Sequence, residues 1–152
     1  MQFTHEVALP VRAPWRDIWA EWNDVHALPR LLSHVSAAAP GGHEDLAELA
    51  ICLEGRHIEF AVERTMCAGR TLCWQSAGSL FLYVLSVRLD TLPDGGGVTL
   101  TVTVAYDPPG FLPDIAESLG LSRRFKRELD ADLRRYVRTL EANCLASLVL
   151  VD

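Results

Sequence analysis

Apolar and polar residues alternate along most of the chain before Asp107, and this period of two predicts β-strands. The alternating segments are Phe3–Pro10, Ala47–Leu53, Arg56–Met66, Thr71–Ser76, Leu80–Leu92 and Val98–Tyr106. In the last segment apolar residues alternate with threonine, which predicts a sheet with one buried face. Turn residues separate the segments or end the sheet at Ala68-Gly69, Gly78-Ser79 and Asp107–Gly110, and most clearly in the loop Pro93–Gly97. We therefore expect successive strands to pair as antiparallel hairpins.

Apolar residues return at helical spacing in two places. Pro14 suits the first position of a helix, and the tryptophan and isoleucine residues that follow it share one helical face. Asn23-Asp24 is expected to cap a second short helix, in which Pro29 either starts a further turn or bends the helix. From Leu112 onward one apolar stripe predicts a long helix, interrupted at Gly120, with the members Phe125, Leu129, Leu133, Tyr136, Val137 and Leu140.

This order of elements predicts an α+β fold in a single domain of residues 1–152. We expect a strongly curved antiparallel sheet of about six or seven strands wrapped around the long C-terminal helix, with two short helices after the first strand. An internal hydrophobic cavity is expected where the sheet bends away from the helix, and a ligand would bind there. The segment after Ser33 has small residues and no clear period, which favours irregular structure.

The formal net charge of −6 disfavours binding to nucleic acid, whose phosphates require a basic face. The one basic run contains Arg123, Arg124, Lys126 and Arg127; acidic residues follow it at once, so we interpret it as a solvated helix face. Four cysteines occur without a C-x-x-C pair, so we expect free thiols and no metal site.

No signal peptide is expected before the first strand, and together with the free thiols this favours a cytoplasmic protein. The apolar tail Cys144–Val151 is too short to span a bilayer. It either forms the contact of a homodimer or packs back on the sheet.

Two arginines lie among the alternate residues of Arg56–Met66 that are expected to face the core. This set of alternate residues is apolar, but it begins with Arg56 and ends with Arg64. Burying a guanidinium group is costly unless it is paired or solvated. Arg64 therefore either reaches water at the strand end or points inward, where its donors can hold an oxygen-rich ligand. A structural role and a pocket role remain open for three aromatic residues on buried phases, Trp74, Tyr83 and Tyr136.

Three stretches resemble the polyketide cyclase/dehydrase branch of the START-like, or Bet v 1-like, superfamily: VRAPWRDIWAEWNDVHALPRLLSHV (11–35), GRHIEFAVER (55–64) and VAYDPPGF (104–111). The resemblance covers nearly the whole chain and implies the helix-grip fold. The chain looks most similar to the single-domain bacterial aromatase/cyclases. These bind a poly-β-ketone held on an acyl carrier protein and promote its aldol ring closure and dehydration. Their motif arginine falls on Arg64, while an aromatic residue and a Glu-Tyr pair of their lid correspond to Leu28 and to His34-Val35.

The resemblance thus implies a polyketide cyclase, aromatase or dehydratase of antibiotic or pigment biosynthesis, with no cofactor and with a carrier protein as a partner. Ring closure removes a proton beside a carbonyl, stabilises an enolate and releases water. Arg64 is the expected donor to the enolate, and His34 is the expected acid and base. The expected substrate contacts are Leu28, Val35, Phe60, Val62, Trp74, Tyr83, Val102, Tyr106, Phe125 and Tyr136. The alternative is a non-catalytic binding or transport protein for a quinone, lipid or polyketide.

Overall fold

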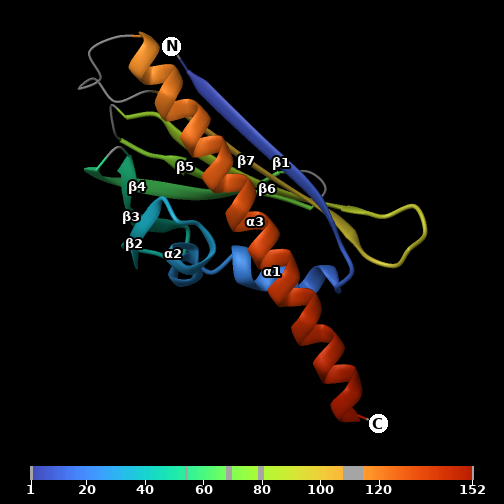
Figure 1. The fold of residues 1–152 in the computed structure, drawn as a ribbon. Helices are drawn as coiled ribbons and strands as arrows, with labels where there is room; N and C mark the ends of the chain where they lie inside the picture. Colours follow the sequence, from blue (N-terminus) through green and yellow to red (C-terminus); the bar gives the residue numbers. More distant parts are fainter. Residues whose placement is uncertain (1, 54, 68–69, 79–80, 108–114, 152) are drawn as a thin grey trace.

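The computed structural model describes residues 2–53, 55–67, 70–78, 81–107 and 115–151. The strands are β1 (Phe3–Val11), β2 (Val35–Pro40), β3 (Leu46–Leu53), β4 (Arg56–Cys67), β5 (Thr71–Ser76), β6 (Tyr83–Thr91) and β7 (Val98–Tyr106). The helices are α1 (Trp15–Trp22), the 3-10 turn η1 (Val25–Ala27), α2 (Leu28–Leu31) and α3 (Ile115–Val151). The strands form one antiparallel sheet of seven in the order β1-β7-β6-β5-β4-β3-β2, which curves around α3 (Figure 1). The predicted α+β fold is confirmed.

The alternation of the strands sets which face of the sheet packs against α3. Val102 of β7 pairs with Val7 of β1 on one side and with Val87 of β6 on the other, and all three valines are buried. On α3 the predicted stripe is buried as well, from Phe125 to Leu140. Sheet and helix therefore bury one continuous apolar core between them.

Two secondary-structure expectations were wrong. β2 occupies the segment after Ser33 that we expected to be irregular, and it pairs with β3 from Val35 onward. It lies at the edge of the sheet, and only its first side chain is buried. Because neither of its faces is buried along its length, the sequence shows no alternation of apolar and polar residues there. Gly120 does not interrupt α3, since the helix continues through it and Leu121 packs into the core directly afterwards.

Smaller differences concern element ends. Pro14 is the N-cap of α1, with an extended backbone (φ −63°, ψ 138°), and is not the first helical residue. Pro29 is the second residue of α2, within its first turn, and does not bend the preceding turn. β6 begins at Tyr83, three residues later than Leu80. The turns expected at Ala68-Gly69, Gly78-Ser79 and Asp107–Gly110 lie wholly or partly outside the described residues.

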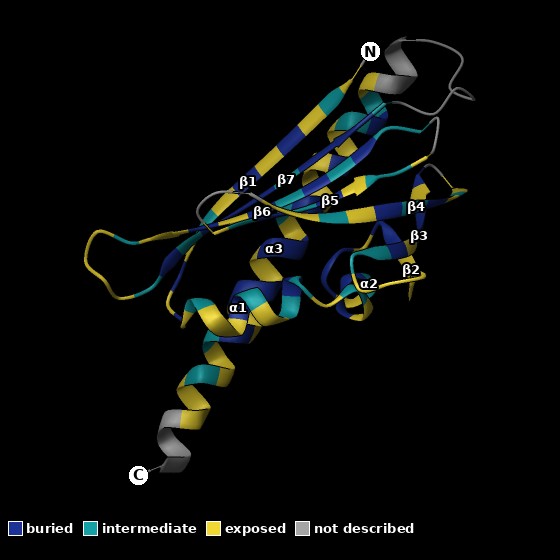
Figure 2. Ribbon diagram, turned by 180° about the vertical axis from the view of Figure 1, so that it is seen from behind, coloured by how far each residue is buried: buried dark blue, intermediate teal, exposed yellow. Residues whose placement is uncertain are grey.

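The last turns of α3 continue beyond the sheet and the short helices (Figures 1 and 2). On this extension the side chain of Leu145 is 64% exposed. The homodimer contact, one of the two alternatives for the tail, stays a prediction. No helix in the described parts of the chain is long and apolar enough to cross a membrane.

Candidate functional site

The segment between β1 and β2 forms a lid that carboxylates fix at its middle and at its end. At its middle the Asp24 side chain accepts a hydrogen bond from the His26 backbone N–H at 3.0 Å, which caps η1. At its end the Ser33 backbone N–H and hydroxyl donate to the two Asp132 oxygens, at 2.8 and 2.5 Å. Asp132 is only 2% exposed, so this contact attaches the end of the lid to the buried side of α3. His34 follows directly and is held in the core.

His34 is 3% exposed, and its Nε2 lies 2.7 Å from the hydroxyl of Tyr83 on β6. Burial lowers the pKa of His34 from its usual 6.5 to about 3, because a charged imidazole loses its hydration there. Burial also raises the pKa of the Tyr83 hydroxyl. Both groups are therefore neutral near pH 7 and share one short hydrogen bond, so the pair can accept a proton or give one.

Aromatic rings surround this pair. We call the pair and these rings together the aromatic cluster, which consists of His5, His34, Phe60, Phe81, Tyr83, Tyr106 and Phe125. The Phe125 ring lies at its centre, with its centroid 4.8 Å from that of His34 and 5.1 Å from those of His5 and Tyr106. The Tyr106 hydroxyl is buried and has no hydrogen-bond partner within the described chain, and burial raises its pKa to about 12. A buried donor without a partner is costly in a native protein, so among the described residues this hydroxyl is a candidate donor to a ligand oxygen.

Arg64 belongs to a different network. Its Nε and Nη2 donate to Asp45 Oδ1 at 3.1 and 3.0 Å, and its Nη1 donates to Asn23 Oδ1 at 2.9 Å. The guanidinium also lies over the Trp74 ring, 5.6 Å from its centroid. Its side chain is 18% exposed, and its contacts join β4 to the residue that ends α1. None of the interactions found among the described residues connects Arg64 with His34.

The ten predicted substrate contacts are all buried in one core, namely Leu28, Val35, Phe60, Val62, Trp74, Tyr83, Val102, Tyr106, Phe125 and Tyr136. Their aromatic members divide between two places. Phe60, Tyr83, Tyr106 and Phe125 lie in the aromatic cluster with His34. Trp74 and Tyr136 instead contact Trp22 under the lid. Tyr136 also donates to Glu21 at 3.1 Å, and the burial and this carboxylate raise its pKa.

Two grooves border α3 where Phe125 enters the core. One, of about 780 Å³, lies between β1 and α3, and its floor includes His5. The other, of about 140 Å³, lies between α3 and the end of β3, and Phe125 itself lines it beside Cys52 and Arg124. The internal hydrophobic cavity stays a prediction, because between these grooves the described interior is filled by the aromatic cluster. Within the described ranges no group of three histidine, cysteine or acidic side chains is placed to hold a metal ion.

Sequence reasoning missed two buried residues of this region. One is His5, which falls on the same phase of β1 as the buried Val7, and that phase was the available signal. Asp132 was overlooked because it is charged, yet it lies three residues after Leu129 and four before Tyr136, on the apolar stripe of α3. His26 and His43 are exposed.

No protein-family model matches the chain, and no curated protein matches its sequence. Solved structures do match. One from Deinococcus radiodurans superposes with a TM-score of 0.75 at 19% identity, over 93% of this chain and 98% of the other. A START superfamily protein from Mycobacterium smegmatis gives 0.68 at 14% identity, over 90% and 98%. The Zhui aromatase/cyclase from Streptomyces sp. R1128 gives 0.64 at 13% identity, over 94% and 93%.

Proposed function

We propose that this protein, which has the helix-grip fold of START-like and Bet v 1-like proteins, binds a poly-β-ketone between its curved sheet and α3 and promotes aldol ring closure and dehydration. One observation carries the proposal. The neutral pair of His34 and Tyr83 lies in an apolar aromatic cluster with the Tyr106 hydroxyl, which has no hydrogen-bond partner among the described residues. This arrangement combines a base, an acid and a donor with surfaces that pack against flat rings.

The chemistry needs a proton acceptor that is unprotonated before reaction. Neutral His34 Nε2 exchanges its hydrogen bond with the Tyr83 hydroxyl for the substrate and takes a proton from the carbon between two carbonyls, while the enolate oxygen accepts a hydrogen bond from the Tyr106 hydroxyl. The enolate carbon then bonds to a second carbonyl carbon of the chain, whose oxygen takes the proton back from His34. Loss of water repeats the exchange, with His34 removing a second proton and returning it to the departing hydroxyl. Burial makes the imidazolium a strong acid and His34 a weak base, so the return of each proton is favourable, while the first proton removal relies on the Tyr106 hydrogen bond to stabilise the enolate.

Arg64 enters the proposal in one of two roles. As donor to the enolate, its guanidinium would have to leave Asn23 or Asp45. As a positioning residue, it holds the lid on β4, and its charge stays balanced by Asp45. Asn23→Ala separates the roles: it leaves the guanidinium in place, so it lowers product formation only if Arg64 acts through the lid. Arg64→Ala is expected to abolish product formation in either role.

The test adds the protein to a minimal polyketide synthase, with substrate chains on its acyl carrier protein, and compares the products by chromatography and mass spectrometry. We expect the intact protein to change the product profile and His34→Gln to lose this effect. His57→Gln is the matched control, because His57 is exposed and contacts only Glu59 among the described residues. An unchanged profile with the intact protein would contradict the proposal.

A second candidate function is binding or transport of a hydrophobic ligand without turnover. The balanced charge of Arg64 favours it, since a guanidinium already paired with Asp45 has less electrostatic effect on an enolate. Native mass spectrometry of freshly purified protein distinguishes the two functions. A hydrophobic passenger in a one-to-one ratio, together with an unchanged product profile, supports binding alone.

A further inference from the structure

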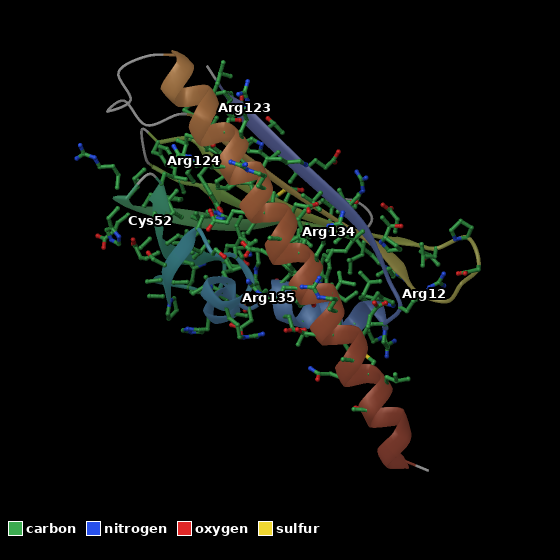
Figure 3. The ribbon with its side chains drawn as sticks, viewed as in Figure 1. Arg12, Cys52, Arg123, Arg124, Arg134 and Arg135 are labelled. Carbon is green, nitrogen blue, oxygen red and sulfur yellow. The ribbon has the colours of Figure 1, made fainter. Side chains whose placement is uncertain are left out.

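The groove between β1 and α3 is positively charged in a protein that is acidic as a whole. Arg123, Lys126 and Arg127 of α3 line it, against the single carboxylate of Glu6. Figure 3 shows Arg123 on the part of α3 that lies beside β1. Six arginines elsewhere in the described chain pair with acids, as Arg12 does with Asp94. In the described chain, by contrast, neither Arg123 nor Arg127 forms an ion pair.

The remaining polar contacts of the groove are weak or use backbone. Lys126 Nζ donates to the carbonyl oxygen of Glu6, so its charge is not neutralised. The Glu6 carboxylate faces Thr103, whose hydroxyl lies 3.5 Å from it. Ser122 Oγ lies 3.4 Å from His5 Nε2 across the seam between α3 and β1. The groove therefore keeps a positive excess although the chain carries a net charge of −6.

The floor of this groove is also the edge of the aromatic cluster. The His5 ring lies 5.7 Å from that of Tyr106 and 5.1 Å from that of Phe125. Beyond them lie the His34–Tyr83 pair and the Tyr106 hydroxyl, for which the described parts of the chain supply no partner. A ligand reaching from the groove into the cluster would therefore meet cations first, and then stacked rings and a free hydroxyl.

We propose that this groove is a subsite for an anionic group at one end of the ligand whose ring body occupies the aromatic cluster. The inference rests on the site of the proposed function and adds a charge requirement to its substrate. The anion is either the carboxylate of a free acid or the phosphate of the tether that holds a carrier-bound chain. Both accept hydrogen bonds from guanidinium groups and gain from the positive excess.

The experiment measures the affinity of four probes with the same ring body by titration calorimetry. They are 2-naphthylacetate, its neutral amide, the pantetheine thioester of the same acid, and that thioester with a phosphate on the pantetheine. Each is titrated into the wild type, into Arg123→Gln/Arg127→Gln, and into Arg134→Gln/Arg138→Gln. The last variant removes the same charge from α3 outside the groove.

We expect at least one anionic probe to bind more tightly than its neutral counterpart, by roughly two- to thirty-fold for two exposed cations. The preference is lost in Arg123→Gln/Arg127→Gln, kept in the control variant, and weakened by added salt in the wild type. A preference for the carboxylate identifies a free acid, and one for the phosphate identifies the tethered chain. Equal affinities for the acetate and its amide, and for the thioester with and without phosphate, overturn the subsite. If the neutral probes still bind, the proposed function is not contradicted. If no probe binds, both proposals fail.

Discussion

Replacing His34 by glutamine is expected to remove much of the pH dependence of folding stability. In the unfolded chain an imidazole takes up a proton near its usual pKa of 6.5, whereas burial lowers the pKa of His34 to about 3 in the folded protein. Protons therefore bind the unfolded state preferentially, and stability is lost as the pH falls from about 6.5 toward 3. Between about pH 7.5 and about pH 5 this single group costs about 2 kcal/mol.

Urea unfolding of the wild type and of His34→Gln at both pH values measures this difference. Glutamine can still accept a hydrogen bond from Tyr83 but does not titrate. Titratable groups present in both proteins contribute equally and cancel in the comparison; one of them is His5, whose pKa burial lowers. We expect the wild type to lose about 2 kcal/mol more than the variant over this range. His57→Gln keeps the wild-type dependence. Equal losses in the wild type and His34→Gln would refute the assignment of a buried, neutral imidazole.

Three further predictions concern the hydrogen bonds of the site. Tyr83→Phe is expected to lower the free energy of unfolding by about 1 kcal/mol, because it leaves the imidazole without its partner, whereas Tyr106→Phe leaves stability unchanged or raises it. Equal losses in urea unfolding would show that the Tyr106 hydroxyl has a partner. A double-mutant cycle of Arg64→Ala with Asp45→Ala is expected to give a coupling of at most about 1 kcal/mol, since the carboxylate is half exposed, and a larger value would contradict this. Asp132→Ala is expected to cost about 2 kcal/mol in thermal unfolding and Asp132→Asn less, because the amide can still accept one bond from the lid. Equal costs would argue against the hydrogen bonds.

The fold was predictable because local periods report it directly. Alternation in β7 and the stripe of α3 each fix a buried face, and one sheet and one long helix have few ways to bury those faces together. β2 was not predicted, because an edge strand with one buried residue shows no such period of apolar residues. Gly120 was misread because packing of the neighbouring Leu121 outweighs the weak helix propensity of one glycine.

The site was predictable only in part, since strand phase gives the direction of a side chain but not its partner. The alternation of β4 predicted that Phe60 faces the core, and it does. The same alternation placed Arg64 on that face, and its side chain is largely shielded from solvent. The partner of Arg64, Asp45, lies in the turn before β3, and only the folded chain brings the two together. The same holds for His34 and Tyr83, which are far apart in the sequence and meet across the core.

The separation of Arg64 from His34 changes how the resemblance is understood. The two residues expected to act together belong to different contacts: one holds the lid and the other lies among aromatic rings. The proposed proton transfers therefore rest on His34, Tyr83 and Tyr106. Arg64 would influence them mainly by keeping the lid in place.

The central claim, that a ring-bearing ligand enters the aromatic cluster and meets His34, is tested most directly by the imidazole resonances in NMR. Titration of ¹⁵N-labelled protein with 2-naphthylacetamide, recorded near neutral pH, follows the ring nitrogens of His34 and of the exposed His57 in one spectrum. The account predicts saturable shifts of the His34 nitrogens and none at His57, with the His34 shifts reduced in Tyr106→Phe. Binding that leaves His34 unshifted, or that shifts only the exposed histidines, would contradict it.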